Sequence, residues 1–208
     1  SEALAEQILQ PVFEEALLIK FNGSCRFAHD RIQQVVYSLI DTFERVRLHW
    51  HIGQIWLKET TPNAKNERIL EIVRHLNLGS GLIETEAERL ELAELNFKAA
   101  QTARSRTAYA AASDLTKTAI DLIAMDGWQI NYPLMLNLYH LAAEVSYLNL
   151  DYEQSEQYIK TAIAQARSLL DRIPTYTILI QVYHNQNLLD EAIEAGLVVL
   201  DELGFTLL

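Results

Sequence analysis

The sequence predicts an almost entirely α-helical chain that contains repeated helical pairs and one small β-hairpin. Apolar residues recur at spacings of three and four, which is the period of a helix packed along one face. Seven glycines and four prolines in 208 residues are few, and they fall mostly between the periodic segments. One stretch departs from this pattern, because residues 17–27 place Asn22-Gly23, a dipeptide typical of hairpin turns, between two apolar and β-prone arms.

The periodic segments and the breaks between them predict ten helices. They are expected at residues 3–19, 29–41, 43–58, 67–78, 85–104, 107–124, 132–149, 152–169, 173–186 and 188–203. Pro11 either starts a second helix inside the first segment or kinks a single one, because it lacks a backbone donor. We expect Asp126-Gly127 to close one helix, Tyr132-Pro133 to open the next, and Gly204 to terminate the last.

The chain is expected to divide near residue 60 into two parts, residues 1–57 and residues 58–208. Residues 59–66, Glu-Thr-Thr-Pro-Asn-Ala-Lys-Asn, form the most polar stretch of the sequence. Pro62 beside Asn63 in this stretch is a strong signal for a break between helices. The first part then contains the hairpin, and the second part is entirely helical.

Three units of the second part can be overlaid, as expected for helix-turn-helix repeats that stack into a solenoid. Small residues early in each second helix serve as anchors, namely Ala112, Ser155 and Ala192. Small or aromatic residues lie eight or nine positions before the anchors, and small or aliphatic residues lie seven after: Ala103, Tyr147 and Tyr183, then Ala119, Ala162 and Val199.

This pattern resembles the tetratricopeptide repeat, most closely in residues 147–155. The units are longer than the 34 residues of that repeat, and Gly196 occupies a position where an aromatic residue is usual. We therefore describe the expected fold class as all-α, with a tetratricopeptide-like helical repeat. A helical bundle without repeats would show the same periodicity and is the alternative.

The composition favours a chain that acts in the cytoplasm. With 17 basic and 28 acidic side chains, the formal net charge of −11 would repel a phosphate backbone, so no nucleic-acid partner is expected. No apolar run reaches the roughly 20 residues that span a bilayer, and the N-terminus lacks the basic segment of a signal peptide. Cys25 is the single cysteine. Without a CxxC partner, it is expected to be an inert, buried thiol.

The motifs of complete ATPases and kinases are missing. No Gly-x-x-x-x-Gly-Lys-Ser/Thr loop is present to bind phosphates, and neither His-Arg-Asp nor Asp-Phe-Gly occurs. We therefore expect no catalytic residues in this chain.

The histidines do not predict a metal site. His49 and His51 are two positions apart on one helix and point about 200° from one another, whereas ligands on one face need spacings of three or four. His75, His140 and His184 are isolated along the chain, and a lone helical histidine is more often packed or solvated than a metal ligand.

One stretch carries a more specific signal. Residues 27–40 read Phe-Ala-His-Asp-Arg-Ile-Gln-Gln-Val-Val-Tyr-Ser-Leu-Ile. Together with residues 48–57, 72–77 and 92–96, this stretch resembles the region after the ATPase core in signal-transduction NTPases with numerous domains. In these proteins the region lies between a serine/threonine kinase domain and sensor or histidine-kinase domains. The resemblance covers nearly all of the chain, and Phe-x-His-Asp-Arg-Ile-Gln-Gln is its most specific part.

The resemblance implies that residues 1–57 are the winged-helix-like end of an ATPase module, with the hairpin as its wing. His29 and Asp30 would match the His-Asp of the winged-helix motif, in which the histidine contacts the β-phosphate of bound ADP. They would bind nucleotide phosphate only in the full-length parent, for which ATP or ADP is the implied cofactor; the fragment itself is expected to hold none. Alternatively, His29 is the first residue of a packed helix that Asp30 caps.

The leading hypothesis is a non-catalytic interaction and signal-relay module. It would couple a nucleotide switch to neighbouring domains of the parent chain or to a protein partner. One alternative is an independent peptide- or protein-binding scaffold, in which the first 57 residues cap the solenoid. Another is a nucleotide-sensing part of a kinase with a direct role in phosphoryl transfer.

Overall fold

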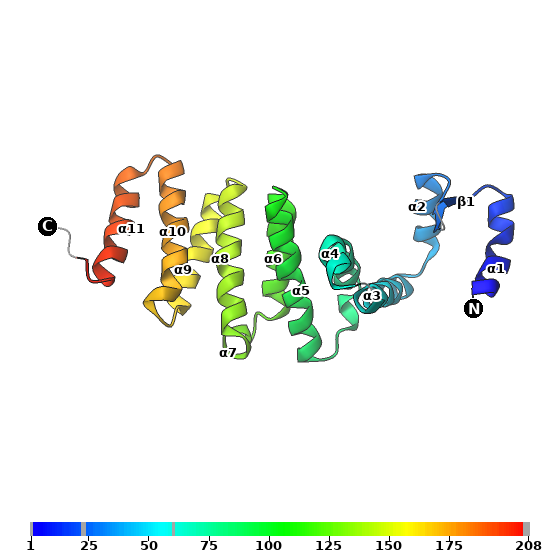
Figure 1. Cartoon of the computed structure of the whole chain (residues 1–208), viewed down its shortest axis with the longest axis horizontal. Helices are drawn as coiled ribbons and strands as arrows, with labels where there is room; N and C mark the ends of the chain where they lie inside the picture. The colour runs from blue at the N-terminus through cyan, green and yellow to red at the C-terminus, as the bar shows by residue number, and fades with distance from the viewer. Residues whose placement is uncertain (1, 22–23, 60, 206–208) are drawn as a thin grey trace. The chain divides into compact units, whose positions relative to one another are not determined.

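The computed structural model describes residues 2–21, 24–59 and 61–205 (Figure 1). Within these ranges it contains eleven α-helices, one 3-10 helix and one two-stranded sheet. In chain order the elements are α1 (Glu2–Glu14), β1 (Leu18–Phe21), β2 (Ser24–Phe27), α2 (Asp30–Leu39), α3 (Thr42–Glu59), α4 (Pro62–Leu78), η1 (Ser80–Leu82), α5 (Glu86–Ser105), α6 (Tyr109–Leu122), α7 (Gly127–Ile130), α8 (Tyr132–Leu148), α9 (Tyr152–Gln165), α10 (Leu169–Asn185) and α11 (Leu189–Glu202).

The contacts divide the chain into two compact units, 1–48 and 49–208, so that the boundary lies inside α3. The polar stretch after residue 58, where the sequence placed the boundary, connects α3 to α4 within the second unit. Pro62 begins α4, where a proline is tolerated because the first turn of a helix needs no backbone donor. The winged-helix and repeat identities expected for the two parts stay predictions.

The hairpin predicted near the N-terminus is present. β1 and β2 pair antiparallel, with Leu18 opposite Phe27 and Lys20 opposite Cys25. The Asn22-Gly23 turn lies outside the described residues.

The helix predicted over 3–19 was too long, because it ends at Glu14 and residues 18–21 belong to the sheet. Cys25 is exposed, contrary to the expectation of a buried thiol, since it lies in a two-stranded sheet that leaves it open to solvent.

Pro11 lies inside one continuous helix, α1, and does not start a second. Among the side chains described in the first unit, none is buried. α2 shows this most clearly, because Val35, Val36 and Leu39 are all exposed although they are apolar. The described side chains of this unit therefore form no core with which it could stabilise itself.

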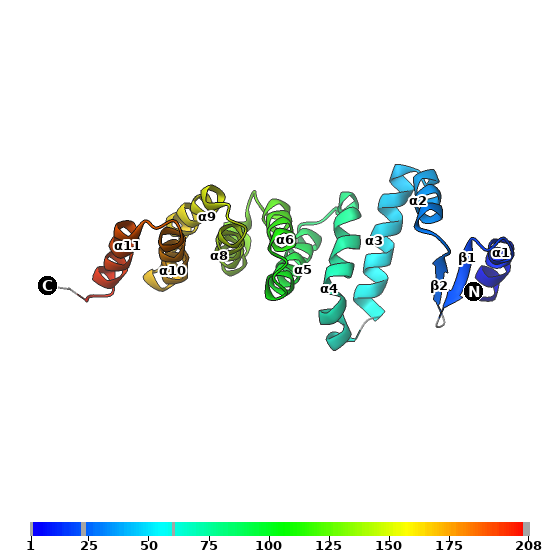
Figure 2. The ribbon, with the colours of Figure 1, turned by 90° about the horizontal axis from the view of Figure 1, so that it is seen from above.

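The second unit is a series of helical pairs. Helices α5 and α6, α8 and α9, and α10 and α11 pack against each other within each pair, and the pairs follow one another in chain order (Figures 1 and 2). The second helix of each pair has 14 residues. Each first helix also contacts a helix of the preceding pair, as α8 does with α6 and α10 with α9.

The turn inside each pair has the same geometry. Thr107, Leu150 and Asn187 each adopt a left-handed backbone conformation, with φ of 59°, 64° and 61°. Each is the first residue beyond the cap of a helix, and two backbone N–H groups bond back to the last helical turn. In the second pair, for example, Leu150 donates to the carbonyl of Tyr147 at 2.9 Å and Asp151 to that of Ser146 at 2.9 Å.

This turn recurs at the spacing on which the sequence overlay was built. Leu150 lies 43 positions after Thr107, and Asn187 lies 37 after Leu150, as do the anchors of the same pairs. One residue of the overlay was wrong. The carbonyls that accept the outer hydrogen bond of each turn belong to Ala103, Ser146 and Tyr183, so Ser146 and not Tyr147 is the equivalent residue.

Several further helix boundaries differ from the prediction. α4 begins at Pro62 and not at residue 67, and α9 ends at Gln165 and not at residue 169. Asp126-Gly127 does not close a helix, because α6 ends at Leu122 and Asp126 instead precedes the short helix α7. α10 begins at Leu169, four residues earlier than expected. Ser168 starts it through a capping box, in which its hydroxyl accepts from the backbone of Asp171 and the Asp171 carboxylate accepts from the backbone of Ser168. Gly204 terminates α11 with a φ of 85°, as predicted.

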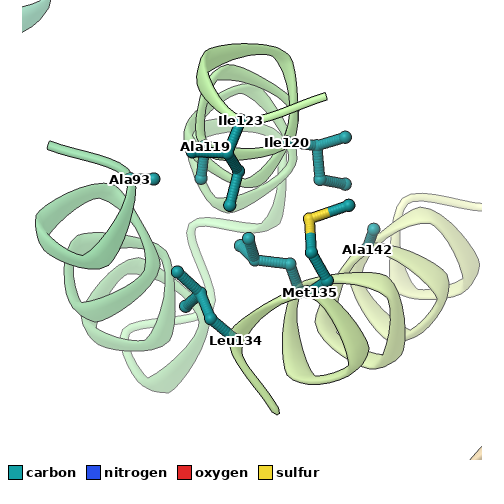
Figure 3. Close-up of a cluster of buried hydrophobic side chains, with 8 residues drawn as sticks. Ala93, Ala119, Ile120, Ile123, Leu134, Met135 and Ala142 are labelled. Carbon is teal, nitrogen blue, oxygen red and sulfur yellow. The ribbon is translucent and has the colours of Figure 1, made fainter. Parts of the chain in front are cut away.

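The core of the second unit passes from one pair to the next. Figure 3 shows a cluster in which α5, α6 and α8 meet. The labelled residues are Ala93, Ala119, Ile120, Ile123, Leu134, Met135 and Ala142. Because α8 packs into the groove between α5 and α6, neighbouring pairs share this core. Among the described residues, no helix combines the length and apolar character needed to cross a bilayer.

The left-handed turn gives a direct test of the fold. Leu150 is 72% exposed, so replacing it removes little packing, whereas a β-carbon in the left-handed region costs about 1–2 kcal/mol. Glycine avoids that cost but loses about 0.5–1 kcal/mol of backbone entropy. We expect Leu150→Gly to raise the free energy of unfolding by roughly 0.5–1 kcal/mol, measured by urea denaturation. Asn149→Gly, at an adjacent position with φ of −84°, should lower it, and equal losses in both variants would contradict the turn geometry.

Candidate functional site

His29 and Asp30, the residues that the sequence singled out, lie at the exposed start of α2. His29 is the capping residue, and its carbonyl accepts the backbone N–H groups of Ile32 at 3.0 Å and Gln33 at 3.3 Å. Its imidazole makes no capping hydrogen bond. Asp30 lies in the first turn and does not cap the helix, and α2 buries none of its residues. Both side chains are therefore accessible to a ligand or to another domain.

A pair of histidines forms the most distinctive contact of the second unit. His49 on α3 and His75 on α4 place their Nδ1 atoms 2.8 Å apart, so one ring donates an N–H to the other. Sequence reasoning missed this pair, because His75 is isolated along the chain. The two residues are 26 positions apart, and only the packing of α3 on α4 brings them together. The apolar pattern shared by the two helices indicated that they pack, but not which side chains meet.

Aromatic and cationic groups surround the histidine pair. Trp56 packs its ring edge-on against His75, with centroids 5.0 Å apart, and the Arg68 guanidinium lies 4.2 Å from the centroid of the Trp56 ring. Gly53 and Gly79 allow α3 and α4 to approach this closely. A β-carbon at Gly53 would lie 2.6 Å from the Leu76 side chain, and one at Gly79 would lie 2.6 Å from a backbone nitrogen of α3.

The environment of the pair disfavours its charged forms. Burial lowers the pKa of His49, and the nearby Arg74 lowers it further. Burial also lowers the pKa of His75, as do the charges of His49 and Arg74, while Glu71 acts in the opposite direction. Among the described residues, no group of three or more histidine, cysteine or acidic side chains is arranged to hold a metal ion. The two neutral rings can together take up one additional proton, which they share between their Nδ1 atoms. A second additional proton would place two positive charges 2.8 Å apart.

Polar side chains link each helical pair to the next. Asn77 on α4 and Asn96 on α5 exchange two amide hydrogen bonds, of 2.8 and 2.9 Å, and Asn96 is fully buried. Further along, Arg104 on α5 forms an ion pair with Glu144 on α8. Asn185 on α10 then donates to the hydroxyl oxygen of Tyr147 on α8 at 2.8 Å. Directional contacts thus join α4 to α5, and they join the first helices of the successive pairs, α5, α8 and α10, to one another.

A second set of contacts closes the opposite end of α8. The Tyr132 hydroxyl donates to the Asp171 carboxylate at 2.7 Å and accepts the backbone N–H of Arg167 at 2.9 Å. This bond from Tyr132 lowers the pKa of Asp171. The Arg167 guanidinium lies 3.9 Å from the centroid of the Tyr132 ring and donates to the Trp128 carbonyl at 3.0 Å. α7, α8 and the start of α10 are therefore held together where the chain changes direction.

A pocket of about 340 Å³ lies where α5 begins and α6 ends. Its lining includes the acidic side chains Glu86, Asp121 and Asp126 and one basic side chain, Arg89. Carboxylates repel a phosphate group, and one guanidinium does not replace the set of backbone and lysine donors that hold nucleotide phosphates. The pocket does not have the chemistry of a nucleotide site.

Comparisons with known proteins connect the chain to signal transduction. No protein-family model and no solved structure matches it. The chain is 25% identical, over 212 aligned positions, to the hybrid signal transduction histidine kinase G of Dictyostelium discoideum. The alignment covers 87% of this chain but only 6% of that protein. The similarity therefore links this chain to a small part of a large signal-transduction protein.

The histidine pair predicts a pH dependence of stability. Because the folded-state pKa values lie below the ordinary value of 6.5, the unfolded chain binds more protons between the two values. The stability that this contributes is present above about pH 6.5 and is lost as the pH falls towards the lowered values. We expect His49→Gln combined with His75→Gln to reduce the fall in Tm between about pH 7 and about pH 5.

His51→Gln is the matched control, because His51 is exposed on the same helix. It should leave the fall in Tm unchanged. The effect will be partial even in the double variant, since burial also lowers the pKa of His140. An unchanged pH profile in the double variant would show that the pair does not couple protonation to folding.

The asparagine pair predicts a loss of stability when one partner is removed. Asn77→Ala would remove the amide that exchanges both hydrogen bonds with the buried Asn96. We expect this to lower the free energy of unfolding by about 1–3 kcal/mol. Asn137→Ala, at an exposed position on α8, should change the free energy of unfolding by less than about 0.5 kcal/mol. Urea denaturation distinguishes the two outcomes, and equal effects would mean that the amide exchange is not formed.

Proposed function

We propose that this chain is a non-catalytic interaction and signal-relay module of a large multi-domain signalling protein. It would couple a nucleotide switch to neighbouring domains or to a protein partner. The observation that carries the proposal is the match to a signal transduction histidine kinase over most of this chain but over only 6% of that protein. A segment of that size within a long chain is suited to connecting domains. The parent would be a protein kinase with an ATPase module.

In this proposal the first unit is the winged-helix-like end of the ATPase module. The hairpin followed directly by α2 supports it, as does the lack of buried side chains among its described residues, because such a unit needs another body to cover it. His29 and Asp30 would contact the phosphate of ATP or ADP in the parent. An exposed imidazole at the start of a helix, beside backbone N–H groups that have no partner in the helix, suits a phosphate oxygen.

The second unit would be a tetratricopeptide-like helical repeat that moves as one body. The recurring left-handed turn and the matching spacing of the anchors support the repeat. The shared core and the polar links from α4 to α10 support the rigid coupling of successive pairs. A displacement of α4 would then be transmitted to α10 while the contacts between successive helical pairs stay intact.

An independent peptide- or protein-binding scaffold is the second candidate. It is favoured by the distribution of the core, because every buried hydrophobic residue that the structure describes lies in the second unit. This unit has the means to fold without the first. A direct part in phosphoryl transfer has less support, since the pocket beside α5 is lined by three carboxylates and only one cationic side chain.

Nucleotide binding tests the proposal. We expect residues 1–208 alone to show no shift in Tm with millimolar ADP or ATP and no turnover. A longer polypeptide that includes the N-terminal neighbour should bind ADP and should lose at least tenfold in affinity on His29→Ala, measured by calorimetry. His184→Ala, at an exposed histidine of α10, is the matched control and should bind as the unaltered chain does. Turnover by residues 1–208, or equal affinity in both variants, would overturn the proposal.

A further inference from the structure

The last helix of the second unit has a wider apolar surface than its neighbour covers. α10 packs against α11 and buries Ala195, which is 8% exposed. Along another line of the helix, Leu189, Ile193 and Leu197 are 51%, 60% and 43% exposed. They are spaced four apart and therefore lie along one side of α11. We call these three residues the α11 stripe.

The equivalent residues of the earlier pairs divide the stripe into two parts. Leu189 corresponds to Tyr152 of α9, which packs against the core, whereas the other two stripe residues correspond to polar side chains. Counted from the left-handed residue of each turn, Ile193 corresponds to Glu156 of α9, and Leu197 corresponds to Lys160. Glu156 and Lys160 form an ion pair of 3.6 Å on α9, with their side chains 34% and 77% exposed. Leu197 also corresponds to Lys117 of α6, which is exposed. α9 and α6 keep polar side chains here even though α10 and α8 pack beside them. A further pair of the same kind would therefore cover Leu189 and part of Ile193 but would leave Leu197 exposed.

The charges beside the stripe indicate what covers it. At 100° per residue, Asp190, Glu194 and Asp201 lie along the edge next to Leu197. α11 carries no lysine, arginine or histidine. Two copies of this chain whose α11 helices met antiparallel at the stripe would bring two rows of carboxylates together, which disfavours that dimer. A surface that presents cations beside apolar side chains would pair with both features.

We propose that the α11 stripe is a docking surface for one amphipathic helix of a partner protein. That helix would present apolar residues at spacings of three and four, with lysine or arginine along the side that faces the acidic row. The inference rests on the proposed interaction role and gives the chemistry of one partner. Its test uses no nucleotide, so its failure would leave the coupling between the nucleotide switch and the array untouched.

The test uses a synthetic peptide of 18 residues with leucines at helical spacing and arginines along one edge. A second peptide, in which glutamates replace the arginines, controls for charge. The informative variant combines Ile193→Glu with Leu197→Lys, which introduces on α11 the ion pair found at Glu156 and Lys160 and leaves the net charge unchanged. We expect the basic peptide to bind residues 1–208 at physiological salt, and at least tenfold more weakly to the variant.

Circular dichroism and thermal melting of the double variant show whether it folds. Lys160→Ala, at the equivalent edge of α9, is the matched control and should bind as the unaltered chain does. Equal binding by the double variant or by the acidic peptide would overturn the proposal. Two further results would also overturn the proposal. A dimer that light scattering detects and the double variant abolishes would mean that a second copy of the chain covers the stripe. Loss of peptide binding in a longer polypeptide that extends past residue 208 would mean that the added segment covers it.

Discussion

Small side chains at the contacts between helices determine how the second unit is built. Ala93 and Ala119 lie where α5, α6 and α8 meet, and Ala100, Ala103 and Ala112 lie in the next layer. All five are almost fully excluded from solvent. A larger side chain at such a position would force the helices apart, because protein interiors have little space to absorb added volume. The left-handed turns hold the two helices of each pair close together, so the short turn and the small residues depend on each other.

This close packing has a consequence for function. Because α8 shares its core with α5 and α6, and because polar side chains join α4 to α5, α5 to α8 and α8 to α10, the helical pairs are not independent bodies. The contact between His49 on α3 and His75 on α4 differs from these, because it joins two side chains that can be protonated. It is the point at which protonation would weaken the packing, and α3 also contains the boundary between the two units. In the proposed relay, the helical array would therefore begin directly after a contact that protonation weakens.

The sequence predicted the long helices well and the contacts between them poorly. α8 was placed within one residue of its bounds, because its apolar period is long and Pro133 marks its start. α7 was missed because a helix of four residues has no measurable period. His29 was proposed from a local motif and stays a prediction, whereas the partner of His75 lies on another helix and no local pattern identifies it. The exposed apolar stripe on α11 could not be predicted either, because the residues equivalent to it in the other pairs are known only from the positions of the left-handed turns.

Hydrogen exchange tests the central claim, that the second unit transmits a nucleotide-dependent displacement as one body. The measurement compares a longer polypeptide, extended to include the proposed ATPase module, with and without ADP. We expect the change in protection to appear at α2 and α3 and to continue through α4, α5 and α8 to α10. Changes that stop before α4 while ADP is bound would contradict it, because the array would then be a separate scaffold and not the moving part of a switch.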